Sequence, residues 1–146
     1  MIKRIVGILI CLVIAAPAFS VPASAEPGAE LEIHIMGGLP LPFFLHLVGG
    51  VIGNIGDTAA YNISYQLTIT GGLIDGIHKS YEGFAEEIQP GNGISVLANN
   101  VFGFGPVDIV ITASASNAEN VTNTGKGFQF REFTWVPFSW INAIKK

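Results

Sequence analysis

The residue types that usually carry out chemistry are few in this chain, and their spacing does not match a catalytic or zinc site. The three histidines, His34, His46 and His78, fall on three separate segments with no His-x-His or His-x-x-x-His pair. Zinc ligands are normally supplied at closer spacing. No serine has the Gly-x-Ser-x-Gly context that presents a nucleophile on a sharp turn. We therefore interpret the histidines as strand residues.

The acidic residues are spread along the chain. Asp57 and Asp75 occur in turn sequences, where aspartate is favoured because its side chain bonds the nearby backbone. No Asp-x-Asp-x-Asp loop is present for calcium, and Gly103-Phe104-Gly105 lacks the following Lys-Ser/Thr of a phosphate loop. We predict no cofactor, no metal ion and no enzymatic activity. A glycosidase-like carboxylate pair is an alternative that the sequence leaves open.

Two features indicate contact with other molecules. Asn62-Ile63-Ser64 and Asn120-Val121-Thr122 are N-glycosylation sequons, so Asn62 and Asn120 are candidate modification sites in an exported chain.

An aromatic group near the C-terminus is the second feature. It consists of Phe133, Trp135, Phe138 and Trp140, and two lysines end the chain. Aromatic side chains are enriched at binding interfaces and, for tryptophan, at membrane surfaces. Two interpretations stay open: the rings close the end of a core, or they form an interaction surface.

Residues 1–25 have the features of a signal peptide. A basic start precedes an apolar run over Ile5–Ala16, and Ala23-Ser24-Ala25 is a small-x-small site with cleavage expected before Glu26. The apolar run is shorter than the roughly 20 residues that span a bilayer, and no transmembrane segment is predicted in the mature chain. We predict a secreted or cell-surface protein, with a retained membrane anchor as the alternative.

The charge and cysteine content limit the partners. The formal net charge is −4, and loss of the leader makes it more negative. Such a chain is a poor match for nucleic acid or for anionic lipid. Cys11, the single cysteine, lies in the leader, so core burial alone must stabilise the exported part, which has a sufficient length for this.

Period-two alternation of apolar and polar residues predicts half-buried strands, and it is clearest over 60–70 and 107–115. In the first, the side predicted to be buried holds Tyr61, Ile63, Tyr65, Leu67 and Ile69. Further strands are expected over 30–36, 43–55 with a bulge or bend at Gly49-Gly50, 77–88, 94–98, and 125–136 with a bulge at Arg131-Glu132. The segments 99–106 and 116–124 are expected to be a connection and an exposed hairpin end.

About seven strands separated by turns, with no amphipathic helix, predict an all-β chain. We expect an immunoglobulin-like β-sandwich over 26–136, after the signal peptide 1–25 and before an aromatic tail over 137–146.

The turn residues resemble those of a known family. They are Asn54-x-Gly56-Asp57 before a strand that ends in Gly71-Gly72, then Pro90-Gly91, Phe102-Gly103-Phe104-Gly105 and Gly125-x-Gly127-Phe128. This pattern is similar to the immunoglobulin-like modules of bacterial and archaeal surface proteins, in the style of the cell-adhesion-related domain found in bacteria (CARDB). The resemblance covers most of the exported chain. It implies adhesion, or display and spacing at the cell surface.

We therefore predict a non-enzymatic secreted or cell-surface module for adhesion or protein–protein contact, with an unidentified surface protein or glycan as its partner. The main alternative is a carbohydrate-binding sandwich that uses surface aromatics. A small secreted enzyme or enzyme inhibitor, with Asn99–Pro106 as a wedge, is a third hypothesis. Exposed edge strands provide a route to self-association.

Overall fold

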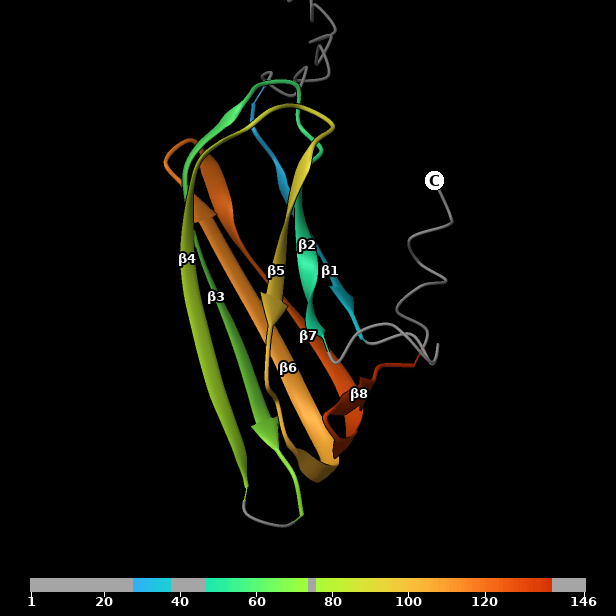
Figure 1. The fold of residues 1–146 in the computed structure, drawn as a ribbon. Coiled ribbons are helices and arrows are strands. Elements are labelled where there is room, and N and C mark those ends of the chain that lie inside the picture. Colours follow the sequence, from blue (N-terminus) through green and yellow to red (C-terminus); the bar gives the residue numbers. More distant parts are fainter. Residues whose placement is uncertain (1–27, 38–46, 74–75, 138–146) are drawn as a thin grey trace, which may run out of the picture.

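Two antiparallel sheets pack face to face in a β-sandwich (Figure 1). The computed structural model describes residues 28–37, 47–73 and 76–137, and these contain strands and turns but no helix. The smaller sheet has the order β1 (Leu31–Met36), β2 (Val48–Asn54), β5 (Gly93–Ala98). The larger sheet has the order β4 (Ile77–Ile88), β3 (Ala60–Gly71), β6 (Gly103–Ala115), β7 (Ala118–Arg131), β8 (Phe133–Trp135).

The strand order confirms the predicted immunoglobulin-like wiring. The chain changes sheet between β2 and β3, between β4 and β5, and between β5 and β6. As a result β5 pairs with β2, and β6 pairs with β3. These non-consecutive neighbours give the Greek-key connections of such sandwiches. The described residues contain eight strands rather than the expected seven, because the short β8 follows β7.

The core lies between the sheets and consists of the inward residues of both. Ile52 of β2, Leu67 of β3 and Ile109 and Ile111 of β6 have no exposed surface. Most inward positions are aliphatic, including many β-branched residues, which suit the pleated surface of a strand. The alternation predicted for 107–115 is confirmed in the burial of β6.

The alternation predicted for 60–70 holds only from Ile63 onward. Tyr61 was predicted to face the core, but it is 47% exposed. The reason is local: Asn62 has a φ of 52°, which reverses the side-chain parity at the start of β3. Ala60, rather than Tyr61, is buried there.

The predicted bulge at Gly49-Gly50 is not present. Both glycines keep a continuous register, Gly49 with Leu97 and Gly50 with Val96. A Cβ on Gly49 would overlap the carbonyl oxygen of Val96. The register therefore excludes a bulge, and the glycines permit a close approach of neighbouring strands. Positions 43–46 of the expected strand lie outside the described residues.

Two segments expected to be connections belong to long strands. β6 begins at Gly103, inside the predicted connection 99–106, and β7 begins at Ala118, inside the predicted hairpin end. The polar residues Thr122, Asn123 and Thr124 pair with β6 and so belong to the sheet rather than to a loop.

The predicted bulge at Arg131-Glu132 is instead a two-residue hairpin turn between β7 and β8. Phe130 pairs with Phe133 across it, and Arg131 has a φ of 56°. Because of this two-residue turn, the odd-numbered Phe133 and Trp135 share a sheet face with the even-numbered Phe128 and Phe130.

Asn54, at the end of β2, connects the chain segments at one end of the sandwich. Its side chain is fully buried. Oδ1 accepts hydrogen bonds from the backbone N–H groups of Glu30 (3.2 Å) and Gly56 (3.1 Å). Nδ2 donates to the carbonyl oxygens of Thr58 (2.7 Å) and Ile88 (2.9 Å). One amide thus links the entry to β1, the β2–β3 connection and the end of β4.

Replacing Asn54 by alanine would leave these four backbone groups without their partner in a buried site. We expect Asn54→Ala to lower the free energy of unfolding by about 3 kcal/mol, because each unsatisfied buried group is costly. Urea unfolding followed by circular dichroism measures this. Asn120→Ala, at an exposed asparagine, is the control and should change the free energy by less than about 0.5 kcal/mol. Equal effects of the two substitutions would contradict the assigned role.

Candidate interaction surface

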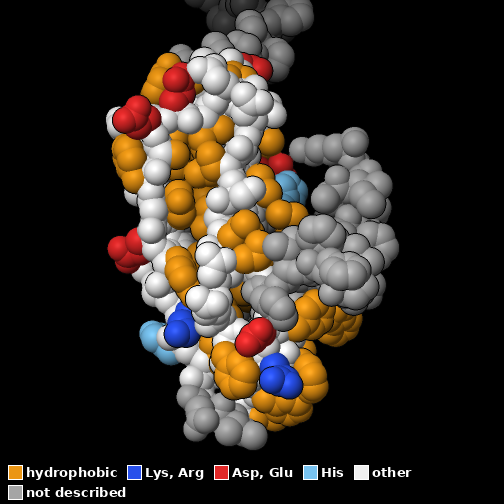
Figure 2. Space-filling model, viewed as in Figure 1, with side chains coloured by type: hydrophobic (Ala, Val, Ile, Leu, Met, Phe, Trp, Pro, Cys, Tyr) orange, Lys and Arg blue, Asp and Glu red, His pale blue; other side chains and the backbone are white. Residues whose placement is uncertain are grey.

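Aromatic side chains gather on the outer face of the five-stranded sheet, where β6, β7 and β8 lie side by side. The strand registers place Phe104 opposite Phe130, Phe130 opposite Phe133, and Phe128 opposite Trp135. Paired residues share a sheet face, so these side chains form one group. We call it the aromatic cluster: Phe104, Phe128, Phe130, Phe133 and Trp135. Figure 2 shows hydrophobic side chains gathered at this end of the molecule.

The cluster is open to solvent. Phe130 is 56% exposed, Trp135 52%, Phe104 41% and Phe128 37%, while Phe133 is half-buried. At about 200 Å² per aromatic side chain, these fractions correspond to roughly 400 Å² of exposed ring surface. The largest apolar patch on a typical monomer measures about 300–600 Å² and is often functional, so the cluster is a candidate contact surface.

The rings pack edge to face around Phe104. The ring centroids of Phe104 and Phe128 are 5.3 Å apart with planes at 86°, and those of Phe104 and Phe130 are 6.0 Å apart at 65°. This is the favoured geometry for aromatic pairs. The surface of the cluster is therefore uneven. Its phenylalanine rings do not form the flat row that the carbohydrate-binding hypothesis predicts.

A buried polar group holds the β7–β8 hairpin that carries the cluster. Gln129 points to the opposite side of β7 from Phe128 and Phe130 and is fully buried. Its Nε2 donates to the carbonyl oxygens of Val101 (2.8 Å) and Arg131 (2.9 Å), and Thr134 Oγ1 donates to its Oε1. The described residues contain no buried side-chain N or O atom without a hydrogen-bond partner.

The structure brings together only part of the predicted site. Phe133 and Trp135 lie in the cluster, whereas Phe138 and Trp140 lie outside the described residues. Phe104, Phe128 and Phe130 were not predicted as site residues. Only the pairing of β6 with β7 shows that Phe128 and Phe130 share a sheet face with Phe104.

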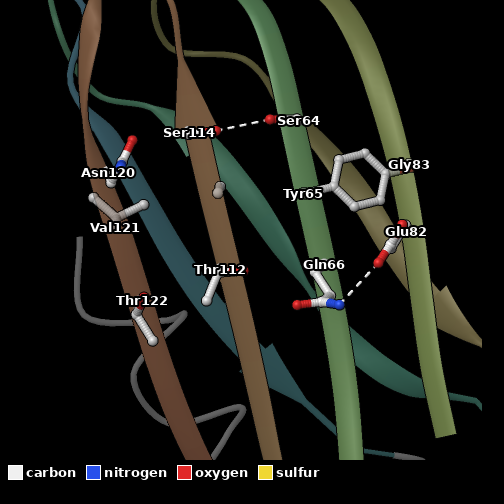
Figure 3. A pocket seen from close by; sticks show the side chains of 11 residues that line it. Ser64, Tyr65, Gln66, Glu82, Gly83, Thr112, Ser114, Asn120, Val121 and Thr122 are labelled. Atoms are coloured by element: carbon white, nitrogen blue, oxygen red, sulfur yellow. Dashed lines mark hydrogen bonds between the residues drawn. The ribbon is translucent and has the colours of Figure 1, made fainter.

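A polar groove of about 480 Å³ crosses the same sheet face nearer its other end (Figure 3). Side chains of β3, β4, β6 and β7 line it, among them Gln66, Glu82, Thr112, Thr122, Ser64, Ser114 and Asn120. Gln66 Nε2 donates to Glu82 Oε1 (2.9 Å), and the hydroxyl oxygens of Ser64 and Ser114 are 2.7 Å apart. Tyr65 lies over Gly83 of the edge strand, where a Cβ would overlap the tyrosine ring.

Between the groove and the aromatic cluster, Lys126 Nζ lies 3.0 Å from Asp108 Oδ1. Both side chains are largely exposed, so this ion pair contributes little to stability.

The two sequons have exposed asparagines. Asn120 lines the groove. Asn62 Nδ2 donates to Ser116 Oγ at 3.5 Å, beside the turn that joins β6 to β7. Both side chains are accessible from solvent, and their glycosylation stays a prediction.

His34 and His78, the histidines among the described residues, lie on strands of different sheets. His34 Nε2 lies 3.2 Å from Glu32 Oε2 on β1, His78 is exposed on β4, and His46 lies outside the described residues. Within the described ranges no group of three His, Cys, Asp or Glu residues could hold a metal ion. In the same part of the chain, no helix is long and apolar enough to cross a membrane.

The fold and this surface define an all-β sandwich with an exposed aromatic cluster on its larger sheet. No protein-family model, curated protein or solved structure matches the chain. The chain is therefore classified by its fold alone, as an all-β sandwich.

The hydrogen bond from Thr134 to Gln129 should hold the β7–β8 hairpin, and with it the aromatic cluster, in a fixed conformation. Thr134→Val keeps the shape but leaves the buried Gln129 Oε1 unpaired, so we expect a loss of about 2 kcal/mol in stability. We also expect easier iodide quenching of Trp135 fluorescence, measured in a Trp140→Phe background that leaves one tryptophan. Thr124→Val, at an exposed position of β7, should alter neither quantity. Unchanged quenching in Thr134→Val would show that the hairpin is held by other contacts.

Proposed function

We propose that this chain is a non-enzymatic, immunoglobulin-like module, secreted or held at the cell surface, that contacts another protein through the aromatic cluster. The exposure of the cluster carries the proposal. Its four most exposed rings are 37–56% exposed, and burial of this surface by a partner would be favourable by about 25 cal/mol per Å² of apolar area.

The composition and shape of the cluster support a protein partner. Tryptophan and arginine are enriched among the residues that dominate protein–protein binding energy, and Arg131 lies in the turn beside Phe130 and Phe133. The edge-to-face rings give a surface with relief that a complementary protein surface can fill. The leader sequence and the resemblance to surface modules support export and an adhesive role.

The ring orientations distinguish this proposal from the alternative. A flat aromatic platform suits the face of a sugar ring, whereas the planes of Phe104 and Phe128 meet at 86°. The aromatic cluster therefore favours contact with a protein.

Binding to the cell envelope of the organism that makes the protein tests the proposal. We expect Phe130→Ser to weaken binding by about tenfold or more, because a truncated anchor at the centre of a contact loses most of its energy. Phe84→Ser is the matched control, since Phe84 is 59% exposed on β4 of the same sheet. Envelope treated with protease should lose the binding, and envelope treated with periodate, which cleaves sugars, should keep it. Equal binding by both variants would refute the cluster as the contact surface.

The polar groove favours a second candidate function, the binding of a neutral glycan. Its walls present hydroxyl, amide and carboxylate groups from four strands, and these are the donors and acceptors that sugar hydroxyls need. This candidate places the sugar in the groove rather than on the aromatic rings.

Retardation of the protein by immobilised polysaccharides tests the second candidate. Gln66→Ala should reduce retardation severalfold, because Gln66 lies in the groove and its amide would otherwise bond the ligand. Thr70→Ala, on the same face of β3 but outside the groove, should leave retardation unchanged. A glycan screen with no hits would exclude this candidate and leave the protein-contact proposal unaffected.

A further inference from the structure

One edge of the five-stranded sheet is formed by β4, the longest edge strand among the described residues. β4 has 12 residues, Ile77–Ile88, and no residue from His78 to Glu87 is buried. In Figure 1, β4 forms the left border of the larger sheet, and no other described strand pairs with it on the outside. This edge is therefore accessible to another chain over most of its length.

The hydrogen bonds of β3 show which way its backbone groups point. Just past the Gly71–Val107 pair, the N–H of Gly72 donates to the carbonyl oxygen of Pro106 (2.8 Å). Backbone groups alternate in direction along an antiparallel strand. The even-numbered residues of β3 from 64 to 70 therefore bond to β6, and the odd-numbered ones bond to β4.

The open backbone groups of β4 follow from this alternation. Tyr81 and Gly83 lie opposite odd-numbered residues of β3 and bond to them. The N–H and C=O groups of the residues between and beside them, Ser80, Glu82 and Phe84, therefore point away from the sheet. All three of these residues are exposed, so their backbone groups are free to pair with a further strand.

The charges of β4 are separated along the strand. His78 and Lys79 lie near its start, and Glu86 and Glu87 lie near its end. Charged residues on an edge strand usually oppose pairing with another chain. When two copies of β4 pair antiparallel, however, the basic start of each lies beside the acidic end of the other. A parallel pair would bring like charges together, so the charges favour a second copy in the antiparallel orientation.

We propose that two copies of this chain associate through β4, antiparallel and with a two-fold axis that passes between the two Gly83 residues. Ser80, Glu82 and Phe84 supply the backbone groups of the new hydrogen bonds, and the two five-stranded sheets become continuous. Such an isologous contact uses the same surface on both chains.

The side chains select Gly83 as the centre of the contact. A centre at Glu82 would place the two Glu82 carboxylates opposite each other, and a centre at Phe84 would place Glu82 opposite Glu86. Like charges directly opposite each other are destabilising. A centre at Gly83 instead places Glu82 of one copy opposite Phe84 of the other, and Lys79 beside the acidic end.

The same centre brings two aromatic rings together. Gly83 has no side chain, and the hydroxyl group of Tyr65 lies where a Cβ on Gly83 would be (Figure 3). Tyr65 therefore reaches from β3 to the edge strand. Around the two-fold axis the two Tyr65 rings become neighbours, and their hydroxyl groups can donate and accept hydrogen bonds.

The dimer leaves the aromatic cluster free, because β4 and β8 are opposite edges of the sheet. The two-fold axis is perpendicular to the sheet, so the clusters of both copies face the same side. Two linked contact surfaces bind a multivalent partner more tightly than one. The inference does not rest on the proposed function, since a different edge makes the contact.

The size of the contact sets its strength. It consists of one pair of strands, and interfaces at the small end of the range are weak. We therefore expect a dissociation constant in the micromolar range or above. Envelope binding measured at lower concentrations reports on the monomer, so Phe84→Ser remains a suitable control in that experiment.

Sedimentation of the purified protein over a range of concentrations tests the dimer. We expect Lys79→Glu to raise the dissociation constant by about tenfold or more, because it places like charges side by side twice in each dimer. Adding Glu87→Lys to this variant should return the constant toward the wild-type value, because the exchange recreates the opposite charges. Lys126→Glu, the same charge change at an exposed lysine of β7, should change it by less than about twofold. A wild-type protein that is monomeric up to millimolar concentration, or equal effects of the two single substitutions, would overturn the proposal.

Hydrogen exchange at single residues tests the edge without a variant. The amides of Glu82 and Phe84 should exchange quickly in dilute protein and at least about tenfold more slowly in protein well above the dissociation constant, because only the dimer pairs them. The amides of Tyr81 and Gly83, which bond to β3, should be protected at both concentrations. Exchange of Glu82 and Phe84 that does not depend on concentration would overturn the pairing through β4.

Discussion

The burial of the Asn54 side chain is the constraint on which the arrangement of the two sheets depends. Asn54 ends β2, the last strand before the chain first changes sheet. Besides the four side-chain bonds, its backbone N–H donates to Asn92 O (2.9 Å) and its carbonyl accepts from Gly91 N (2.8 Å). One residue therefore positions the entry to β1, the start of β3 and the turn between β4 and β5. Because β3 pairs with β6 and β6 with β7, this connection also positions the aromatic cluster at the other end.

A second buried amide has the same role at the opposite end. Gln129 connects β7 to the carbonyl of Val101 in the β5–β6 connection and to Thr134 in β8. Between the two amides the core is aliphatic, and apolar contacts are not directional. Hydrogen bonds are directional, and a buried one that is broken is costly. We infer that the aliphatic core supplies most of the stability, while the two amides define which strands meet at each end.

Sequence periodicity could predict the strands whose two faces differ in polarity: it located β3 and β4 well, and it found β6 without its first residues. It could not predict what depends on contacts between distant residues. Asn54 was interpreted as a turn residue, but two of its partners, Glu30 and Ile88, are 24 and 34 positions away. The β7–β8 turn was missed because Arg131 adopts a positive φ without the glycine or asparagine that usually marks one. Only part of the aromatic cluster was predicted. Phe133 and Trp135 are near each other in the sequence, whereas Phe104 is brought to them only by the pairing of β6 with β7.

The exposed rings of the aromatic cluster are supported by their neighbours and by the hairpin beneath them. Phe104 is packed edge to face against two neighbours, and the hairpin beneath the rings is fixed by Gln129. Rings held in this way lose little conformational freedom when a partner covers them, and this loss is one of the main costs of binding. Beside the cluster, the outer face carries the Asp108–Lys126 pair, and Gln66, Thr112 and Thr122 lie in the groove beyond it. A small apolar area with polar residues beside it can select a partner of complementary shape. A partner whose shape does not match would have polar groups removed from water without new hydrogen bonds, which weakens its binding.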